Sequence, residues 1–165
     1  MCVCVYVCPS PSANTDPFSQ IRPLASDDYT RGHLQILSVL TSTPDVGEST
    51  WTAQFNRLKS FSETYYPIVI LTKSDDRICA VGTLFMEYKF IRGCNKAGHI
   101  EDIAVDKNVQ GKGLGKRIIH ALTGICEGLG VYKVFLDCSE ENKGEYGELK
   151  EKRQSGARSS IPQPS

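Results

Sequence analysis

A glycine-rich turn between an apolar strand pattern and an amphipathic helix pattern is the feature that most limits how this chain can fold. The stretch Gly98–Lys116 reads GHIEDIAVDKNVQGKGLGK. Gly111, Gly113 and Gly115 alternate there, so backbone N–H groups can approach a ligand without Cβ atoms in the way. A helix that begins at this turn adds unpaired N–H donors and the positive end of its dipole. The pattern therefore predicts a binding site for a phosphate or pyrophosphate group.

Two common phosphate-binding motifs do not fit this turn. A P-loop built on Gly115-Lys116 would require glycine at position 110 and Ser or Thr at position 117, where the chain has Gln110 and Arg117. A Rossmann turn requires Gly-x-Gly-x-x-Gly. Gly111 and Gly113 satisfy its first half, but a lysine occupies the position of the third glycine. The turn is therefore of another kind.

The pattern that does fit is Gln-x-x-Gly-x-Gly over Gln110–Gly115, which resembles the acetyl-CoA pyrophosphate loop of the GNAT N-acetyltransferase family. Gly98–Val105 and Tyr132–Cys138 narrow the resemblance to the glucosamine 6-phosphate N-acetyltransferases within that family. The resemblance runs from Ile21 to Tyr146. Further similar residues are Val39–Thr41, Lys89–Arg92 and Asn142.

The resemblance implies an α+β (α/β) architecture, the GNAT fold. Its central sheet is mixed and mostly antiparallel, is splayed at the acetyl-CoA site and is flanked by helices. In the family, the strand before the glycine loop has a bulge and splays from its neighbour. Local patterns predict the same order of elements. We expect strands at 21–24, 67–71, 78–90, 98–105 and 131–137, and helices at 28–40 (capped by Ser26 or Asp27), after Ser49, and from Leu114 to Gly128 or Gly130.

Composition indicates one globular domain. The chain has 165 residues, 40% of them hydrophobic, with 19 basic and 19 acidic side chains. Zero net charge gives no case for nucleic-acid binding, and no apolar run is long enough to span a membrane. The seven cysteines are scattered and odd in number, which suits reduced thiols of a cytoplasmic protein. Cys2, Cys4 and Cys8 match no zinc spacing, so no metal is expected.

Three segments are expected along the chain: a disordered leader over 1–20, a GNAT N-acetyltransferase domain over 21–146, and an atypical, disordered tail over 147–165. Glu145 stands where the family has an aromatic residue. The sequence after Tyr146 lacks apolar alternation and is rich in polar residues. We therefore expect the family's C-terminal strands to be lost, as after a frameshift.

The resemblance implies transfer of an acetyl group from acetyl-CoA to the amine of D-glucosamine 6-phosphate, giving N-acetyl-D-glucosamine 6-phosphate and CoA in UDP-N-acetylglucosamine biosynthesis. Asp137 is expected to orient and deprotonate the amine, and Tyr146 to protonate the CoA thiolate. From the residues alone, Asp137 would be a strand-end cap and Tyr146 a packed tyrosine. The residues expected to bind acetyl-CoA are Ile103, Ala104, Val105, Gln110, Gly111, Lys112, Gly113, Leu114, Gly115, Lys116 and Asn142.

The acceptor sugar is expected to contact two further segments. The resemblance assigns binding of the sugar phosphate substrate to Glu101, Asp102 and Asp137. Glu101 and Asp102 are adjacent, so on a regular strand their side chains face opposite sides. It also assigns substrate contacts to Thr41 and to the hairpin residues Lys89, Phe90, Ile91 and Arg92. In the family this hairpin comes from the other subunit, which implies a homodimer. From the residues alone, the hairpin cations would be solvated surface.

Other readings of the sequence stay open. The chain is alternatively a GNAT enzyme that acts on another amine, or a catalytically impaired CoA-binding homologue that has lost its acceptor half. His99 is expected to be structural, His33 to lie on the first helix and His120 on an exposed helix face.

Overall fold

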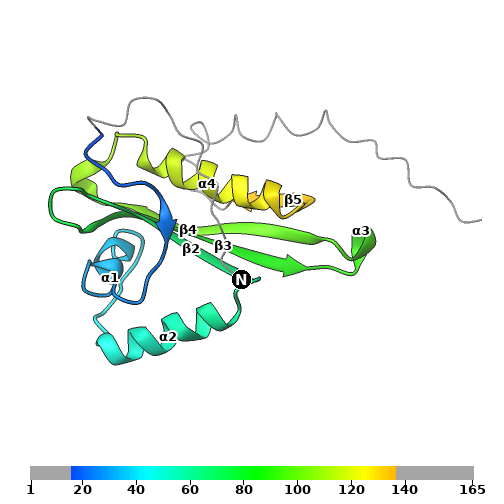
Figure 1. The fold of residues 1–165 in the computed structure, drawn as a ribbon, viewed down its shortest axis with the longest axis horizontal. Coiled ribbons are helices and arrows are strands. Elements are labelled where there is room, and N and C mark those ends of the chain that lie inside the picture. Colours follow the sequence, from blue (N-terminus) through cyan, green and yellow to red (C-terminus); the bar gives the residue numbers. More distant parts are fainter. Residues whose placement is uncertain (1–15, 137–165) are drawn as a thin grey trace, which may run out of the picture.

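The computed structural model describes residues 16–136 of the chain as a five-stranded sheet with helices on both faces (Figure 1). The strands follow chain order across the sheet, β1-β2-β3-β4-β5. The first three pairings are antiparallel and the pairing of β4 with β5 is parallel. The elements are β1 (Arg22–Pro23), α1 (His33–Leu37), α2 (Glu48–Ser60), β2 (Tyr65–Leu71), β3 (Ile78–Tyr88), α3 (Ile91–Cys94), β4 (Lys96–Val105), a 3-10 turn (Lys107–Val109), α4 (Leu114–Gly128) and β5 (Lys133–Leu136). This confirms the expected mixed, mostly antiparallel sheet.

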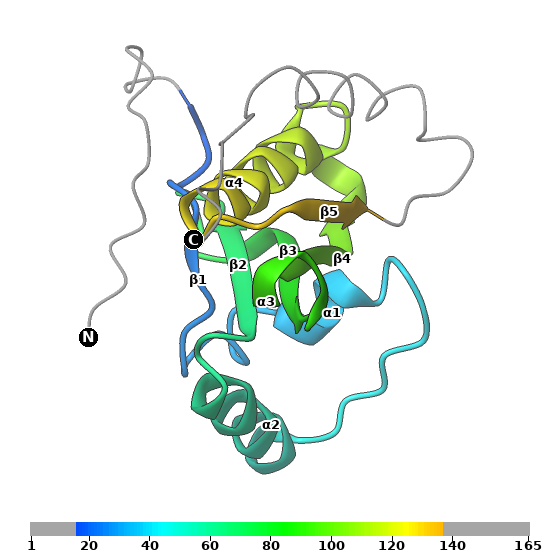
Figure 2. The same ribbon diagram turned by 90° about the vertical axis from the view of Figure 1, so that its right-hand side faces the viewer.

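Helix α4 covers one face of the sheet (Figure 2). Its buried side chains include Leu114, Ile118, Leu122 and Cys126, which recur every fourth residue and so form one stripe along the helix. They pack against buried residues of β2, β3 and β4. Two glycines permit this close approach. A Cβ at Gly82 would lie 2.3 Å from Ile118 Cγ2, and one at Gly98 would lie 2.7 Å from Cys126 Sγ.

Helices α1 and α2 lie on the opposite face (Figure 1). Ile36 of α1 is buried against Val69, Val81 and Ala104 of the sheet. Helix α2 packs beside α1 through aromatic rings. Trp51 stacks on Phe55, with ring centroids 5.4 Å apart, and meets the edge of His33 of α1. The predicted second helix is therefore confirmed, but it begins at Glu48, before the expected start after Ser49. Its buried residues are Trp51 and Phe55.

The first helix is much shorter than the predicted 28–40. Residues 26–32 form turns, and only His33–Leu37 is helical. The side chain of Asp28, fully buried, accepts hydrogen bonds from Ala25 N–H at 2.7 Å and from Arg22 at 2.7 and 2.8 Å. Gly32 then adopts a left-handed conformation, φ 90°. Neither Ser26 nor Asp27 caps α1, because the contacts of Asp28 with Arg22 and Ala25 fix the preceding backbone in turns.

Residues 16–20 belong to the folded part of the chain, so the expected disordered leader over 1–20 is wrong at its end. Phe18 is only 5% exposed and bridges to Thr72, next to β2. Ser19 N–H donates to Leu71 O at 2.7 Å, and Leu71 N–H donates back to Ser19 Oγ at 2.9 Å. The rest of the leader, residues 1–15, and the expected tail, 147–165, lie outside the described residues.

The buried thiols should be chemically protected in the native protein. Burial raises the pKa of Cys79 to about 11, and Cys126 is 0% exposed, whereas Cys94 is exposed. Because the thiolate is the reactive form, iodoacetamide at pH 8 should label Cys94 in the native protein but Cys79 and Cys126 only in denaturant. Peptide mapping by mass spectrometry measures this. Equal native labelling of Cys79 and Cys94 would contradict the burial of β3.

Within residues 16–136, no helix is both long and apolar enough to cross a lipid bilayer. The same part of the chain contains no cluster of three or more His, Cys, Asp or Glu side chains arranged to hold a metal ion.

Candidate active site

A β-bulge interrupts β4 just before the glycine-rich turn. Val81 pairs with Ala104 and Thr83 with Glu101, so Asp102 and Ile103 together face Gly82 of β3. Asp102 adopts the left-handed conformation, φ 55°, which a short polar side chain tolerates better than most. The resemblance implied a bulge on this strand, and the register confirms it. Bulges next to active sites commonly redirect a strand.

The bulge changes which way the two acidic residues lie. Ile100 and Ile103, three positions apart, both pack against the core beneath α4, whereas strict alternation would place them on opposite faces. Glu101 and Asp102 between them are both exposed. The extra residue of the bulge shifts the alternation by one position between Ile100 and Ile103. The rule that neighbours on a regular strand face opposite sides therefore does not apply to Glu101 and Asp102.

In the part of the chain that the structure describes, one edge of β4 is unpaired beside the bulge. Among the described residues, β5 pairs with β4 only from Ala97 to Ile100. No strand within 16–136 covers the same edge from residue 101 to Val105. Backbone N–H and C=O groups of Ile103, Ala104 and Val105 on that side can therefore pair with a ligand that lies along the strand.

The glycine-rich turn forms an open cradle at the start of α4. Gly111 and Gly113 have positive φ, 77° and 74°, and an added Cβ at either would meet no atom within 4 Å among residues 16–136, chain neighbours apart. Within the same residues, no side chain caps the N-terminus of α4. Leu114 is 2% exposed and anchors this end of the helix in the core. The cradle thus fits an anionic group held by backbone N–H donors and the helix dipole.

The polar side chains of the turn have additional contacts. Gln110 Nε2 donates to Val105 O at 3.3 Å, which ties the turn to the end of β4. Lys112 Nζ lies 5.6 Å from the centre of the Phe18 ring. We therefore assign to the Gln110 side chain a role in shaping the loop.

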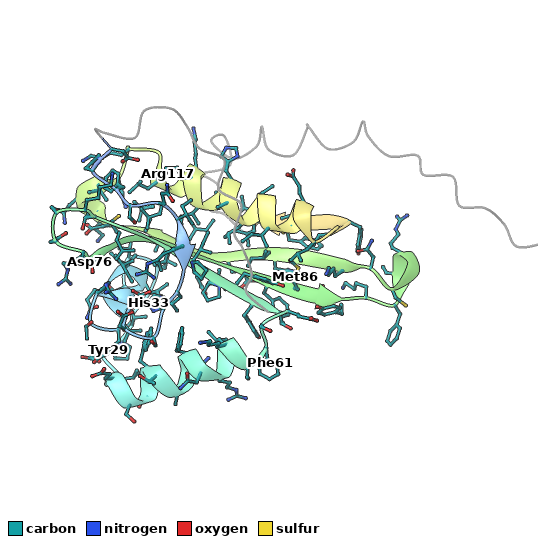
Figure 3. All side chains as sticks on the ribbon, viewed as in Figure 1. Tyr29, His33, Phe61, Asp76, Met86 and Arg117 are labelled. Carbon is teal, nitrogen blue, oxygen red and sulfur yellow. The ribbon has the colours of Figure 1, made fainter. Side chains whose placement is uncertain are left out.

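The N-terminal segment also reaches this end of α4, which the sequence patterns did not indicate. Arg117 Nη1 pairs with Asp16 Oδ2 at 3.1 Å, and Nη2 donates to Ser19 O at 3.2 Å (Figure 3). Arg117 follows the glycine loop directly in sequence, yet its guanidinium serves to hold residues 16–19. Only a long-range contact between segments about a hundred positions apart could reveal this role.

His33 is a further residue near the bulge that sequence reasoning did not connect with it. Trp51 Nε1–H donates to His33 Nδ1 at 3.1 Å, so His33 carries its proton on Nε2 in the neutral form. Burial lowers the pKa of His33, and the negative charges of Asp28 and Asp102 oppose that shift. Asp102 therefore lies close enough to α1 for its charge to act on His33.

The hairpin residues lie away from the bulge within one chain. Lys89, Phe90, Ile91 and Arg92 form the turn after β3, at the far end of the sheet from the glycine loop (Figure 1). Lys96 at the hairpin base is five positions along β4 from Glu101, a separation of about 17 Å. Phe90 is 97% exposed and Ile91 62%. A single chain therefore does not bring the expected hairpin contacts to the acidic residues.

The remaining predicted residues are placed as follows. Thr41 is exposed in the connection from α1 to α2, which Tyr29 holds by donating from its hydroxyl to Asp45 Oδ1 at 2.7 Å. Lys116 lies in the first turn of α4. Asp137, Asn142 and Tyr146 lie outside the described residues.

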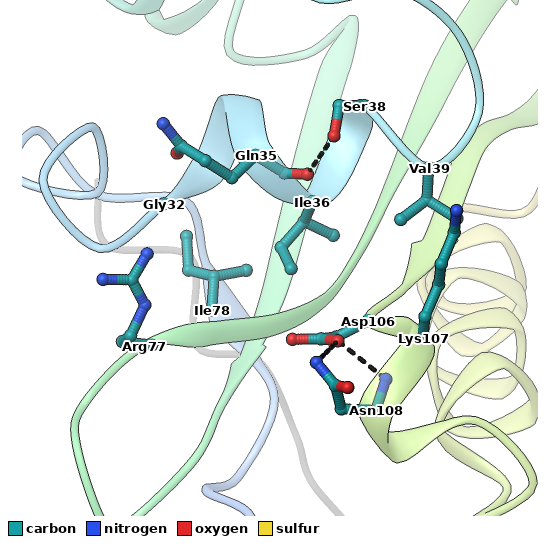
Figure 4. Close-up of a pocket in the computed structure, with 10 residues that line it drawn as sticks. All are labelled: Gly32, Gln35, Ile36, Ser38, Val39, Arg77, Ile78, Asp106, Lys107 and Asn108. Atoms are coloured by element: carbon teal, nitrogen blue, oxygen red, sulfur yellow. Dashed lines mark hydrogen bonds between the residues drawn. The ribbon is translucent and has the colours of Figure 1, made fainter.

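A polar cleft of about 360 Å³ opens between α1 and the loop that follows β4 (Figure 4). Arg77 and Lys107 stand on opposite sides of it, and Asp106 at its base accepts hydrogen bonds from the backbone and side chain of Asn108. None of the predicted site residues that lie within 16–136 lines this cleft. It lies beside the start of the glycine loop and is distinct from the cradle.

Comparisons with known proteins agree with this geometry. The model of the acetyltransferase (GNAT) family matches residues 20–147. The chain is 42% identical over 153 residues to glucosamine 6-phosphate N-acetyltransferase 1 of Dictyostelium discoideum, covering 93% of this chain and 96% of that protein. The crystal structure of glucosamine-6-phosphate N-acetyltransferase from Arabidopsis thaliana superposes with a TM-score of 0.77 at 36% identity, covering 90% of this chain and 97% of that one. An acetyltransferase of Trypanosoma brucei superposes with a TM-score of 0.72 at 32% identity, covering 88% and 96%.

An open-edged bulge followed by a glycine cradle at a helix N-terminus, in this sheet order, defines a GNAT acetyltransferase. Identity to curated relatives extends over almost the whole chain. The chain belongs to the glucosamine 6-phosphate N-acetyltransferase family.

Proposed function

We propose that this protein transfers the acetyl group of acetyl-CoA to the amine of D-glucosamine 6-phosphate, giving N-acetyl-D-glucosamine 6-phosphate and CoA. The observation that carries the proposal is the identity of 42% to a curated enzyme of that name over 93% of the chain. The open cradle at Gly111 and Gly113 and the exposed edge of β4 beside the bulge support the binding of acetyl-CoA.

The proposed cofactor contacts come from the backbone. N–H groups from Gln110 to Lys116 hold the pyrophosphate, and those of Ile103–Val105 pair with the pantetheine arm and polarise the thioester carbonyl. Preorganised donors of this kind commonly supply the largest share of catalysis. Asn142 is proposed as a further contact to CoA.

The proposed chemistry is direct attack of the amine on the thioester. The amine nitrogen bonds to the acetyl carbon, and the C–S bond breaks as CoA leaves as a thiolate. Asp137 orients the amine and accepts its proton, and Tyr146 gives its phenolic proton to the thiolate. Glu101, Asp102 and Thr41 are proposed to position the sugar.

A Tyr146→Phe variant tests the proposed chemistry. We expect the wild-type chain to convert glucosamine 6-phosphate and acetyl-CoA to the N-acetylated product, and the variant to turn over about 100-fold more slowly. Calorimetry should find CoA binding unchanged within about twofold, since only a proton donor is lost. Product is best followed by mass spectrometry, because exposed cysteines of the chain, such as Cys94, would react with thiol-detecting dyes. Wild-type binding of CoA without turnover would contradict the proposal.

We further propose that the protein acts as a homodimer in which the hairpin of one subunit reaches the site of the other. Phe90 and Ile91 expose two large apolar side chains at a hairpin tip, and exposed apolar clusters of this kind commonly mark interfaces. Lys89 and Arg92 would bring positive charge toward the sugar phosphate. A cytoplasmic location, expected from the cysteine pattern, is proposed on that basis alone.

A charge at the hairpin tip should separate the subunits. Phe90→Glu is expected to shift the molar mass measured by light scattering from two chains to one, because a carboxylate would be buried at the interface. Phe61→Glu is the matched control, since Phe61 is an exposed aromatic residue on another part of the surface (52%). A wild-type chain that is already monomeric, or two variants that behave alike, would exclude this interface.

A further inference from the structure

A line of contacts connects the hairpin lysine to the sheet. The Glu87 carboxylate of β3 forms an ion pair with Lys89 through Oε1 and contacts His99 Nε2 of β4 through Oε2 at 3.0 Å. The three side chains are only partly exposed, at 36%, 30% and 26% for Glu87, Lys89 and His99. The pairing with Lys89, followed by that with His99, keeps the pKa of Glu87 below its ordinary value. An ionised carboxylate only accepts hydrogen bonds, so His99 Nε2 is the donor.

Aromatic rings fix the orientation of His99. Its ring stacks on Phe135 of β5, with centroids 4.7 Å apart and planes 19° from parallel, and packs at 5.7 Å against Phe85 of β3. Both rings belong to residues directly opposite His99 in the sheet. Because His99 is held from two sides, the Nε2 edge that meets Glu87 has a defined direction. Glu87 is thereby oriented by the neighbouring strands.

A lysine that recognises an anion gains from such an arrangement. Its ammonium sits on a flexible four-carbon chain that loses conformational freedom when it is fixed. It has three donors, and an ion pair with one carboxylate oxygen leaves the others for phosphate oxygens. A partner carboxylate can therefore set the direction of the ammonium without blocking it.

We infer that Glu87, oriented by His99, is a positioning residue that directs Lys89 toward the 6-phosphate of the acceptor sugar. The inference rests on the proposed function and adds to it a source of specificity for phosphorylated over free glucosamine. Glu87 and His99 act through Lys89 and do not touch the substrate. The ring of Phe135 contributes by holding His99.

Steady-state kinetics of Glu87→Gln test this inference. We expect KM for glucosamine 6-phosphate to rise about tenfold, as for loss of one charge-assisted hydrogen bond. Both kcat and KM for acetyl-CoA should stay within about twofold, as should kcat/KM for glucosamine, which lacks the phosphate. Calorimetry on the CoA-loaded protein should give the same tenfold weaker binding of glucosamine 6-phosphate. The matched control is Glu63→Gln, because Glu63 is exposed and takes no part in the contacts of Glu87 with Lys89 and His99.

Two further variants separate positioning from a merely structural role. In a Lys89→Ala background, Glu87→Gln should cause no further change in KM for glucosamine 6-phosphate, because Glu87 acts only through Lys89. His99→Phe keeps an aromatic ring against Phe135 but removes Nε2, and it should raise KM for glucosamine 6-phosphate about threefold. Additive effects of Glu87→Gln and Lys89→Ala, or an unchanged or lower KM in Glu87→Gln, would overturn the inference while leaving the proposed function intact. A wild-type chain that neither binds nor acetylates glucosamine 6-phosphate would overturn both.

Discussion

An Asp28→Asn variant should lose about 3 kcal/mol of folding free energy at pH 7, as expected when one partner of a buried ion pair is removed. The Asp28 side chain is 0% exposed and accepts hydrogen bonds from Arg22 and Ala25 N–H. We place the loss at the low end of the usual range because the side chain of Arg22 keeps 33% of its exposure. Urea denaturation followed by circular dichroism measures the change.

The pH dependence of the same variant gives a second check. Burial raises the pKa of Asp28, but hydrogen bonds from Arg22 and Ala25 outweigh burial and lower it overall. A lowered native pKa stabilises the fold above the ordinary value of about 3.9, and this contribution is lost as the pH falls below it. The stability gap between wild type and variant should therefore narrow below pH 4. Asp27→Asn, at a carboxylate with 61% side-chain exposure, should cost much less stability than Asp28→Asn, because exposed ion pairs contribute little. A gap that is constant with pH would contradict this account of Asp28.

A Gly113→Ala variant should lower kcat/KM for acetyl-CoA about 100-fold. Left-handed backbone at φ 74° costs about 1–2 kcal/mol for a residue with a Cβ, and displacement of a phosphate oxygen from a backbone N–H adds about 1.5–3 kcal/mol. The open space in front of Gly113 means that the fold itself should lose little beyond the backbone strain.

Gly124→Ala is the matched control on the same helix. Gly124 lies inside α4 with no atom within 4 Å of an added Cβ, so alanine should raise stability by up to about 1 kcal/mol and leave kinetics unchanged. Initial rates over a range of acetyl-CoA concentrations distinguish the two variants. Equal effects, or a Gly113→Ala enzyme with normal kcat/KM, would show that the cradle does not hold the cofactor.

The elements with strong local patterns were predictable from sequence. The apolar stripe from Leu114 gave α4, and the continuous apolar run at 67–71 gave most of β2. The predicted length of helix α1 was too great, because Asp28 hydrogen-bonds to Arg22 and the left-handed backbone of Gly32 turns the chain. Nothing in the local pattern of residues 26–32 reveals that competition, since the decisive partner comes from β1.

Some features of the candidate site were likewise predictable from sequence, and others were not. Glycine spacing alone predicted an open turn at the start of α4, which the structure has. The resemblance added the bulge that the register of β3 and β4 confirms. Contacts between distant segments could not be predicted, because they depend on strand register and on packing across the sheet. Arg117 with Asp16 and Glu87 with His99 are two such pairs.

The most direct test of the central claim is a competition in a single tube. Wild-type chain and acetyl-CoA are incubated with equal concentrations of glucosamine 6-phosphate, glucosamine and a lysine-containing peptide, and the N-acetylated products are counted by mass spectrometry. The account predicts that N-acetylglucosamine 6-phosphate exceeds the other products by at least about 100-fold, the discrimination that a site with buried or paired charges for the phosphate can supply. Dominant acetylation of the peptide or of free glucosamine would contradict it.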